Sequence, residues 1–374
     1  MAGGAPDLLV IGAGPAGLAT ASAGAAAGLR VEVLEAGETV AGSWRTHYDR
    51  LHLHTTRRLS SLPGRGIPAS AGTWVSRDRF IAYLEDYARE LPIRFRTPVR
   101  RLERSAAGWS ARTRTERLNA THVVVATGYN HTAHVPSWPG MGGFAGEILH
   151  SSVYRNPKPF QGRSVLVVGS GNSGAEIAAD LVEGGAGHVS ISIRTPPNIV
   201  RRNLGPLANQ HLGIAVRGLP VGFVDRLSLL VQRIAVGDLS AHGLPLPGRG
   251  VYSRMIEDEQ IPLIDVGFVG HLRAGRITVV PAVDGFEGKH VICGERRLAV
   301  DAVIAATGYR RNLEPLVGHL DVLTPRGRPV IHAPRDSQAA PNLFFIGFTN
   351  PIVGNLYEIS KVARRLAGEI ARRN

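Results

Sequence analysis

Two glycine-rich turns constrain what this chain can fold into more than any other feature. The first has the sequence GAGPAG at residues 12–17, after the apolar run 7–11 and before an alanine-rich stretch that ends at Gly28. The second has the sequence GSGNSG at residues 169–174, after the apolar run 164–168. Short apolar runs are typical of buried parallel strands, and alanine favours helix. Each turn therefore predicts a strand, a tight turn and a helix in succession.

The glycine spacing matches the GxGxxG pattern, in which each glycine has its own physical role. The first permits the tight turn, the second lets the backbone approach a pyrophosphate, and the third lets helix and strand pack closely. The start of the helix then faces the phosphates, because its free N–H groups attract anions. We therefore expect a dinucleotide at the first turn, in contact with Gly12, Gly14, Pro15, Ala16 and Gly17.

The residues after the first predicted helix complete a βαβ unit. Residues 30–34 are expected to form its second strand, and Glu35 and Ala36 follow directly. A carboxylate at this point accepts hydrogen bonds from the ribose hydroxyls of a bound dinucleotide. Because strand, turn, helix, strand and acid all stand in register, the pattern favours a dinucleotide site, with Glu35 and Ala36 as contacts, over a turn that is glycine-rich for structural reasons alone.

The second turn is followed by an arginine where the first has an acid. A helix is expected over 175–181 and a strand over 188–193, after which the next residue is Arg194. An arginine there pairs with a 2′-phosphate, which favours NADPH over NADH. The alternative is that Arg194 is a solvated loop residue in an arginine-rich chain. The other expected cofactor contacts here are Gly169, Gly171, Asn172, Ser173 and Gly174.

Two further segments have nearly the same sequence and indicate that one domain is inserted in the other. Residues 121–129 read THVVVATGY and residues 301–309 read DAVIAATGY, so each is an apolar strand that ends in Ala-Thr-Gly-Tyr. In flavoproteins with two dinucleotide-binding domains, such segments mark the passages between the FAD domain and the nicotinamide domain. The expected cofactor contacts in them are Thr127, Gly128, Thr307 and Gly308.

The expected fold class is therefore α/β, with two nested Rossmann-like dinucleotide-binding domains. The FAD-binding domain is expected to be discontinuous, formed by residues 1–155 and 309–374, and the NADPH-binding domain to span 156–308. A mainly helical insertion is expected near 204–250, because this stretch has no strand-like alternation and is punctuated by proline and glycine.

The C-terminal segment is expected to complete the FAD-binding domain. It contains an expected strand over 343–347 and a final helix over 358–373, with the loop 350–355 between them. The start of that helix can stabilise negative charge at the pyrimidine end of a flavin. Gly347 and Asn355 are the expected cofactor contacts in this segment.

Charge and cysteine content exclude several function classes. The net charge is +13, yet the arginines are scattered with few aromatic residues among them, so we expect no nucleic-acid partner. The single cysteine, Cys293, rules out a CxxC redox pair, and with it the disulfide reductases among pyridine-nucleotide flavoenzymes. One thiol cannot build a metal cluster either, and we expect no metal site.

No segment has the pattern of a secretion signal or a membrane span. The N-terminus lacks the basic region of a signal peptide, and its apolar run is broken by glycines. The longest other apolar stretch, 219–236, is interrupted by Asp225, Arg226 and Arg233. We therefore expect a cytoplasmic protein without an integral membrane segment, and the oligomeric state is not predicted.

A short segment between the two turns carries a family signature. Residues 144–154 read FAGEILHSSVY and match FxGxxxHxxxY through Phe144, Gly146, His150 and Tyr154. This resembles the fingerprint of class B flavin-dependent monooxygenases. The final tyrosine resembles the flavin-containing monooxygenase branch of that class, since Baeyer–Villiger enzymes usually have tryptophan there.

Other segments are similar to the YUCCA subgroup of these enzymes. The similarity extends over roughly residues 7–365, nearly the whole chain. The segments that carry it include Gly42-Ser43-Trp44, 48–54, 171–174, 224–226, 264–267, 306–309 and 347–349.

The resemblance implies a reaction cycle on a small-molecule substrate. NADPH reduces FAD, O2 adds to the flavin C4a atom, and the resulting (hydro)peroxide oxygenates the substrate. YUCCA enzymes use this cycle to decarboxylate an aryl pyruvate to the aryl acetate, while other members of the wider family oxygenate an amine nitrogen or a sulfide sulfur. The protein itself supplies position, water exclusion and electrostatics.

The resemblance also points to site residues. Gly42, Ser43 and Trp44 are implied as cofactor contacts. His54 is implied as a flavin contact and as a catalytic residue, because many flavin-containing monooxygenases have an asparagine in this segment near flavin and substrate. Asn172 is the other catalytic candidate, since its amide can meet the nicotinamide or the flavin. The alternative for His54 is a strand histidine satisfied by a backbone carbonyl.

Two other functions are compatible with the nucleotide-binding pattern. One is an NADPH-dependent flavin reductase that passes electrons to a protein or a quinone, and the segment 144–154 argues against it. The other is a non-catalytic redox sensor that binds nucleotides and signals through its conformation.

Overall fold

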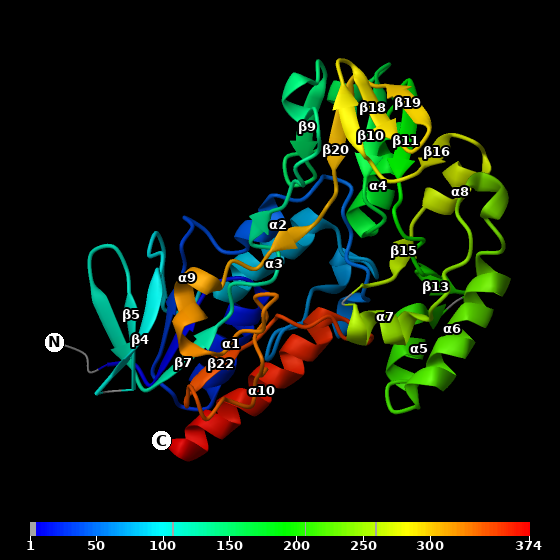
Figure 1. Cartoon of the computed structure of the whole chain (residues 1–374). Helices are drawn as coiled ribbons and strands as arrows, with labels where there is room; N and C mark the ends of the chain where they lie inside the picture. The colour runs from blue at the N-terminus through cyan, green and yellow to red at the C-terminus, as the bar shows by residue number, and fades with distance from the viewer. Residues whose placement is uncertain (1–4, 107, 206, 259) are drawn as a thin grey trace. The chain divides into compact units, whose positions relative to one another are not determined.

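The computed structural model describes residues 5–106, 108–205, 207–258 and 260–374, which form two compact units (Figure 1). The first unit consists of the described residues of Met1–Arg45, Thr55–Thr132 and Tyr309–Asn374. The second consists of those of Thr46–His54 and Ala133–Gly308. The second unit is thus inserted in the chain of the first.

The first unit is built on a five-stranded parallel sheet with the strand order β22-β7-β1-β2-β3. In register, Leu8 lies opposite both Val31 and His122, so β1 is the central strand. The strands are β1 (Leu8–Ile11), β2 (Val31–Leu34), β3 (Ile93–Arg94), β7 (His122–Val125) and β22 (Leu343–Phe345). β1 is buried throughout, as expected of a parallel strand that is covered on both faces.

Different layers cover the two faces of this sheet, because successive side chains of a strand point to opposite sides. Leu9 and Ile11 lie in one core with Trp109 and Leu316, so the antiparallel sheet β4–β6 and helix α9 cover that face. The elements are β4 (Arg101–Ser105), β5 (Gly108–Arg112), β6 (Arg117–Ala120) and α9 (Glu314–Val317).

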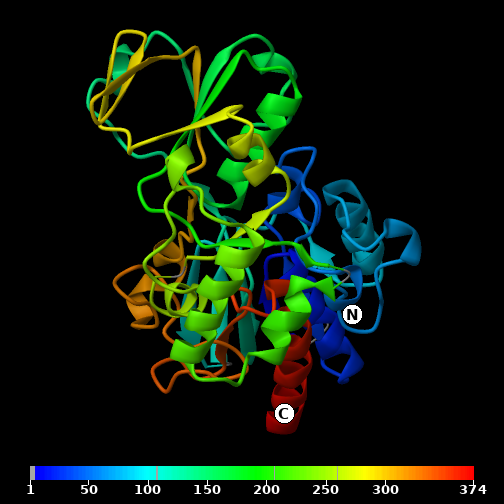
Figure 2. The ribbon, with the colours of Figure 1, turned by 90° about the vertical axis from the view of Figure 1, so that its right-hand side faces the viewer.

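Helices cover the other face of the first sheet. Helix α1 (Pro15–Ala26) packs there, and a Cβ on Gly24 would lie 3.0 Å from Leu8. The C-terminal helix α10 (Asn355–Arg373), red in Figures 1 and 2, lies beside α1. Helices α2 (Gly42–Arg45) and α3 (Arg77–Ala88) complete the layer.

The second unit repeats this plan with the strand order β9-β20-β10-β11-β16, again all parallel. Its strands are β9 (Glu147–His150), β10 (Ser164–Val168), β11 (His188–Ser192), β16 (Ile277–Val280) and β20 (Ala302–Ala305). Helix α4 (Asn172–Glu183) follows β10. The antiparallel strands β17 (Gly285–Glu287), β18 (His290–Cys293) and β19 (Arg296–Ala299) cover one face, through a core that includes Phe286 and Cys293.

The region expected to be a helical insertion is helical over part of its length. It contains α5 (Asn209–Ala215) and α6 (Val221–Ala235), which precede α7 (Val251–Glu257) and α8 (Phe268–Arg273). Contrary to expectation, it also has a short hairpin of β13 (Asn203–Leu204) and β14 (Leu207–Ala208). Near this region, β12 (Ile199–Arg201) pairs with β15 (Leu263–Asp265). A separate pair is formed by β8 (Thr132–Ala133) and β21 (Tyr309–Arg310).

The α/β fold with two nested parallel-sheet units is confirmed, but the expected boundary at 155/156 differs from the observed one. The N-terminal part of the first unit ends at Thr132, and residues 133–155 lie in the second unit. The physical reason is that β9 pairs with β20 as the last strand of the second sheet. Residues 46–54, also expected in the first domain, lie in the second unit because they pack on α4.

Two helices begin earlier than expected. Helix α4 starts at Asn172 rather than at residue 175, and α10 starts at Asn355 rather than at residue 358. Within the described residues, none of the helices is long and apolar enough to cross a membrane.

Candidate functional site

The first glycine-rich turn has the geometry expected of a dinucleotide-binding turn. Gly12 has φ +103°, and a Cβ there would lie 2.9 Å from the Ala126 carbonyl oxygen at the end of β7. A Cβ on Gly17 would lie 1.8 Å from the carbonyl oxygen of Gly12. Since real Cβ contacts are much longer, neither position can take a side chain without a backbone shift, which explains two of the three glycines.

The second turn reproduces these contacts closely. Gly169 has φ +124°, and its Cβ would lie 2.4 Å from the Ala306 carbonyl oxygen at the end of β20. A Cβ on Gly174 would lie 2.0 Å from the carbonyl oxygen of Gly169. The repetition of the same two close approaches indicates that the two turns are built for the same kind of ligand.

The presence of glycine at the middle position of each turn has a different physical reason. Gly14 and Gly171 are the N-caps of α1 and α4, and a Cβ on either would meet no protein atom within 4 Å. No side chain caps either helix at this residue. The space beside each helix start is therefore open and faces N–H groups that a pyrophosphate would satisfy, so both turns fit a bound dinucleotide. Pro15 and Ser173 stand in the first turns of these helices.

Glu35 is held at the first turn by two backbone donors. Its Oε2 atom accepts from the N–H of Ala13 at 2.6 Å, and its Oε1 atom accepts from the N–H of Gly37 at 2.8 Å. These bonds place the carboxylate beside the turn, at the carboxyl end of β2, as the sequence predicts. Ala36 follows it and is exposed.

Arg194 lies at the corresponding position of the second unit. It follows β11 and is exposed, and no hydrogen bond or ion pair holds it in the part of the chain that the structure describes. The hydroxyl of Ser170 donates to the carbonyl oxygen of Thr195 at 3.5 Å, which keeps this strand end next to the turn. The guanidinium is thus available to a ligand bound at the second turn.

The two Ala-Thr-Gly segments also occupy equivalent places, directly after β7 and β20. Gly128 and Gly308 have φ +77° and +80°. The hydroxyl of Thr307 donates to the His134 carbonyl oxygen, while the buried hydroxyl of Thr127 has no hydrogen-bond partner in the described structure.

A second buried oxygen without a partner lies at the start of α10. The Oδ1 atom of Asn355 is buried and unpaired, and the side chain of this residue is hydrogen-bonded to Tyr129. Gly347 has φ +83°, and a Cβ there would lie 2.9 Å from Cβ of Ala16 in the first turn. Because buried polar atoms are nearly always paired, the unpaired oxygens of Thr127 and Asn355 fit a polar ligand in the first unit.

Residues 42–44 form the first turn of α2, where Trp44 packs against Phe80 with ring centroids 4.6 Å apart. A Cβ on Gly42 would meet no protein atom within 4 Å. Ser43 is exposed in the same turn. These contacts give Trp44 a packing role in the first unit, and its expected contact with a cofactor stays a prediction.

The fingerprint segment 144–154 is held by contacts inside the second unit. The Phe144 ring packs on Phe286 with centroids 5.0 Å apart, and a Cβ on Gly146 would lie 2.6 Å from the Phe144 ring. The ring nitrogens of His150 lie 2.9 Å from the Ser152 hydroxyl and 3.0 Å from the Gly308 carbonyl oxygen.

The last fingerprint residue binds α4. Tyr154 is buried, stacks on Phe160 at 5.7 Å, and donates its hydroxyl hydrogen to Asp180 at 2.7 Å. Burial lowers the pKa of His150 and raises the pKa of Asp180. The fingerprint residues thus join β9 and the following loop to β20 and α4, so their role is structural.

His54 belongs to the second unit, where its side chain contacts helix α4. Its Nε2 atom is 2.9 Å from Oε1 of Glu176, and its Nδ1 atom is buried without a partner among the described residues. The Tyr48 hydroxyl donates to Glu176 and accepts from Ser173, and burial followed by the charge of Glu176 raises the pKa of Tyr48 well above its usual value. The expected flavin contact and catalytic role of His54 stay predictions.

Asn172 uses its side chain to hold the backbone before and within β15. Its Oδ1 atom accepts from the N–H of Ile264 at 2.6 Å, and its Nδ2 atom donates to the Pro262 carbonyl oxygen at 3.3 Å. Both ends of the amide therefore have protein partners, which supports a positioning role, and a catalytic role for Asn172 stays a prediction.

The polar face of α4 was not singled out from the sequence. Ser173, Glu176, Asp180 and Glu183 stand three or four residues apart, so they share one side of the helix. Arg50 pairs with Asp180 at 3.4 Å and with Glu183 at 3.1 Å. The signal was available: three acids at helical spacing interrupt an otherwise apolar helix directly after a dinucleotide-binding turn.

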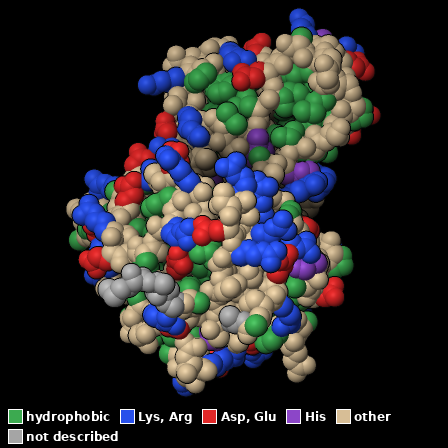
Figure 3. Space-filling model, turned by 90° about the vertical axis from the view of Figure 1, so that its left-hand side faces the viewer, with side chains coloured by type: hydrophobic (Ala, Val, Ile, Leu, Met, Phe, Trp, Pro, Cys, Tyr) green, Lys and Arg blue, Asp and Glu red, His purple; other side chains and the backbone are tan. Residues whose placement is uncertain are grey.

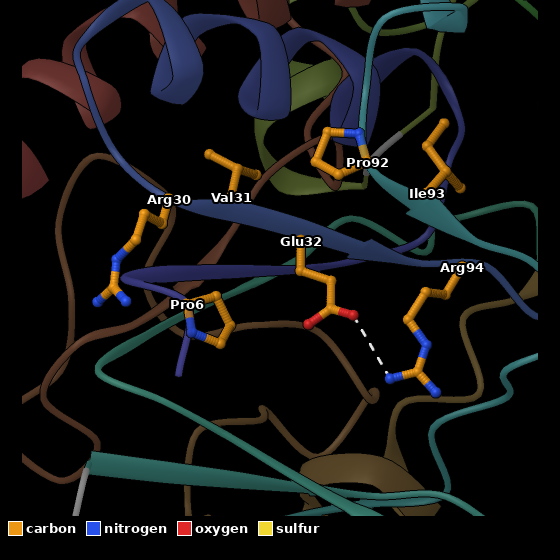
Figure 4. Close-up of a pocket in the computed structure, with 7 residues that line it drawn as sticks. All are labelled: Pro6, Arg30, Val31, Glu32, Pro92, Ile93 and Arg94. Carbon is orange, nitrogen blue, oxygen red and sulfur yellow. Dashed lines mark hydrogen bonds and ion pairs between the residues drawn. The ribbon is translucent and has the colours of Figure 1, made fainter. Parts of the chain in front are cut away.

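One pocket in the first unit lies away from the expected ligand. It is lined by Pro6, Arg30, Val31, Glu32, Pro92, Ile93 and Arg94, beside the first residues of β2 and β3 (Figure 4). Glu32 and Arg94 form an ion pair across it at 3.4 Å. Ligands of open parallel sheets bind beyond the carboxyl ends of the strands, so we assign this pocket no role in dinucleotide binding.

Basic and acidic side chains are interspersed on the face that Figure 3 shows. Many arginines form ion pairs, such as Arg30 with Asp7 at 2.7 Å and Arg373 with Asp336 at 2.8 Å. On this face, the basic side chains are therefore spread among acidic ones.

A model of the pyridine nucleotide-disulphide oxidoreductase family matches residues 9–217, more than half of the chain. Disulfide chemistry is excluded for this member, because its only cysteine, Cys293, is buried, and burial raises the pKa of its thiol to about 11.

Two plant proteins are similar over almost the full length. Indole-3-pyruvate monooxygenase YUCCA1 of Oryza sativa subsp. japonica is 36% identical over 354 residues, which cover 92% of this chain and 87% of the rice protein. Probable indole-3-pyruvate monooxygenase YUCCA3 of Arabidopsis thaliana is 31% identical over 381 residues, which cover 98% of this chain and 86% of the Arabidopsis protein.

The solved structure of a flavin-containing monooxygenase from Stenotrophomonas maltophilia has the same fold. It is 25% identical, superposes with a TM-score of 0.73, and the match covers 99% of both chains. A doubly substituted variant of a flavin monooxygenase from the same organism is 26% identical with a TM-score of 0.75, and it also covers 99% of each chain. This chain therefore belongs to the YUCCA-like flavin-dependent monooxygenases, the FAD- and NADPH-dependent enzymes that oxygenate small organic molecules.

Proposed function

We propose that this enzyme oxidatively decarboxylates an aryl pyruvate to the corresponding aryl acetate. The observation that carries the proposal is the similarity to indole-3-pyruvate monooxygenases over 92–98% of the chain. In the balanced reaction, the keto acid, O2, NADPH and one proton give the shortened carboxylate, CO2, NADP⁺ and water. One oxygen atom of O2 enters the new carboxylate and the other enters water.

We assign FAD to the first unit and NADPH to the second. Bound FAD supplies the activation of O2, and NADPH supplies the hydride. In the first unit, the open helix start at Gly14 receives the pyrophosphate and Glu35 accepts from the ribose hydroxyls. The unpaired buried oxygens of Thr127 and Asn355 support a polar ring system in the same unit.

In the second unit, the open helix start at Gly171 receives the pyrophosphate of NADPH. Arg194, exposed and without a protein partner among the described residues, pairs with the 2′-phosphate. Asn172 acts indirectly, because its amide fixes the backbone at 262–264 beside the start of α4.

The test is a product analysis with ¹⁸O2, NADPH and aryl pyruvates such as indole- or phenylpyruvate. We expect an aryl acetate with one ¹⁸O atom, and one CO2 for each NADPH consumed. An amine and a sulfide are tested in parallel. If they gain oxygen without loss of carbon, the enzyme is an N- or S-oxygenase and the proposed decarboxylation is wrong. NADPH oxidation with no ¹⁸O in any product would favour a flavin reductase. The matched control is Gly171→Ala, which should lose the reaction with each substrate.

A further inference from the structure

One side of helix α6, labelled in Figure 1, is a row of exposed apolar side chains. The row has four members at intervals of four, three and four residues, which we call the α6 stripe: Phe223, Leu227, Leu230 and Ile234. This spacing places all four within about 60° of one another around the helix axis. Phe223 is 56% exposed, Leu230 55% and Ile234 77%. A contiguous apolar row that is this exposed marks a contact surface.

The opposite side of α6 is fastened to the second unit. Gln232 is buried, and its Oε1 atom accepts from the N–H of Ile199 in β12 at 3.0 Å. The Asp225 carboxylate accepts from the N–H of Tyr252 in α7 at 2.7 Å. Because Asp225 and Gln232 lie on the far side of the helix from the stripe, turning the stripe inward would break both contacts.

One edge of the stripe is basic. Arg226 and Arg233 are exposed, and they follow Phe223 and Leu230 by three residues each, so both stand on the same side of the stripe. Asp225 is the only acid in Val221–Ala235, and its carboxylate is bound to α7 on the far side. The charge of Arg233 interacts with Asp238, which lies beyond the end of the helix. The stripe and its edge therefore present apolar surface and positive charge, and no acid.

These charges distinguish between partners for the stripe. A second copy of the chain would bring its own Arg226 and Arg233 to the contact, with no acid of either α6 stripe to pair with them. A membrane span needs a longer and more apolar helix, since α6 has 15 residues. A helix that lies in the plane of an acidic lipid surface needs an apolar side and basic residues beside it, and α6 has both.

We propose that α6 docks this enzyme on a membrane surface that contains acidic phospholipids. The α6 stripe inserts at the boundary between headgroups and acyl chains, and Arg226 and Arg233 bind the lipid phosphates. The contact is peripheral and reversible, because one short helix buries too little apolar surface for permanent attachment. The proposal goes beyond the oxygenation reaction and holds for any substrate, so its test does not depend on the decarboxylation.

A fluorescent label on the stripe tests the contact directly in the FAD-loaded enzyme. Leu230→Cys places an accessible thiol on the stripe, whereas the native Cys293 is buried, and burial raises the pKa of its thiol to about 11. We expect an environment-sensitive label on Leu230→Cys to shift to shorter wavelength when mixed phosphatidylglycerol and phosphatidylcholine vesicles are added. The matched control is Val330→Cys in the first unit, where Val330 is 51% exposed, and its label should not shift.

Sedimentation with the same vesicles measures what each side chain contributes. Leu230→Ser should weaken binding about tenfold, because less apolar surface is buried in the lipid. Arg226→Gln and Arg233→Gln should each weaken it about fivefold, and added salt should reduce this difference. The controls Val330→Ser and Arg326→Gln, at exposed residues of the first unit, should bind like the wild type. Unchanged FAD content and melting temperature exclude misfolding as the cause.

Three results would overturn the proposal. The first is equal binding of the wild type to vesicles of phosphatidylcholine alone, or a wild-type affinity of Leu230→Ser for the acidic vesicles. The second is a shift of the Leu230→Cys label that grows with protein concentration without lipid, because the stripe would then contact a second copy. The third is a loss of flavin reduction by NADPH in Leu230→Ser without vesicles, because the stripe would then serve the active site.

Discussion

The two units of this protein share a backbone plan and differ in the side chains placed around it. Each has a five-stranded parallel sheet and a three-stranded antiparallel sheet, and each has a turn in which the first and third glycines touch backbone atoms. At the end of the second strand one unit has Glu35 and the other Arg194. We therefore propose that the shared backbone plan binds a dinucleotide in each unit and that the residue at the strand end distinguishes which one.

The helices after the two turns differ as well. Helix α1 is rich in alanine, contains no acidic residue, and packs against α10. Helix α4 carries Glu176, Asp180 and Glu183 on one side and packs against residues 46–54. Equivalent helices in a repeated fold can thus bury different partners, because a helix surface can change while the turn before it stays fixed.

The largest expected effect comes from replacing the glycine of each turn whose added Cβ would lie closest to a backbone oxygen. Gly17→Ala would place a Cβ 1.8 Å from a carbonyl oxygen, and Gly174→Ala would place one 2.0 Å from the equivalent oxygen. We expect purified Gly17→Ala to retain almost no FAD, as measured from the flavin absorbance. Gly174→Ala should retain FAD but be reduced by NADPH at least about a hundredfold less efficiently, a loss of about 3 kcal/mol.

The controls for this pair are Gly14→Ala and Gly171→Ala, which meet no protein atom within 4 Å. Both should fold with wild-type melting temperatures, so that any loss concerns the cofactor alone. Loss of FAD in Gly174→Ala with intact FAD in Gly17→Ala would reverse the assignment of the cofactors to the units.

The second effect concerns the strand ends. Arg194→Gln should lower kcat/KM for NADPH about 10- to 100-fold, since a charge-assisted hydrogen bond contributes about 1.5–3 kcal/mol. The kcat/KM for NADH should change less than about twofold, because NADH has no 2′-phosphate. Glu35→Gln should weaken FAD binding and leave the preference for NADPH unchanged. Equal losses with NADPH and NADH in Arg194→Gln would contradict the role of this arginine.

A smaller effect is expected at Asn172, which has no counterpart in the first unit because Pro15 stands at the equivalent position. Asn172→Ala removes the acceptor of the Ile264 N–H and the donor to the Pro262 carbonyl. The second unit should lose about 1–3 kcal/mol of stability. Calorimetry should show a lower melting temperature with unchanged FAD content, and an unchanged melting temperature would mean that these two bonds contribute little.

The smallest effect is a difference in pH dependence between the units. In the first, burial of Asp336 is outweighed by hydrogen bonds from Arg373 and the Asn342 N–H, so its pKa lies below 3.8. Its stabilising contribution is present above pH 3.8 and is lost as pH falls through the lowered pKa. In the second, burial raises the pKa of Asp180 above 3.8, so its contribution is present at low pH and is lost as pH rises.

Melting curves between about pH 3 and pH 6 test this difference. Asp336→Asn should destabilise the protein at the upper end of the range and approach wild type at the lower end. Asp180→Asn should instead be more stable than wild type at the upper end of the range, and this difference should be smaller at the lower end. The same pH trend in both variants would show that Arg50, which pairs with Asp180, outweighs its burial.

Local sequence was sufficient for the turns and for the strands beside them. The strands at 8–11 and 164–168, and the residues at the strand ends, lie where the pattern predicts. The reason is that a tight turn with φ above +100° at its first glycine excludes nearly every other residue there. A few consecutive residues are therefore enough to predict the turn.

Pairings between distant residues depended on the tertiary structure. Strand β9 precedes β10 in the chain but joins the far side of β20, so the domain boundary lies at Thr132 instead of residue 155. Residues 46–54 lie in sequence between two segments of the first unit, yet Tyr48 and His54 contact Glu176. Nothing in those nine residues specifies their partner, because that partner is one side of a helix more than a hundred positions away.

The sequence by itself determined that the chain folds as two nested nucleotide-binding units and that an acid marks one strand end and an arginine the other. These features are local, since the steric demands of glycine and the register of a strand act within a few residues. Only the tertiary structure decided which unit holds His54, because burying the carboxylate of Glu176 requires partners from a distant segment. The tertiary structure likewise made Asn172 a support for residues 262–264, because its partners lie about ninety positions away in the chain.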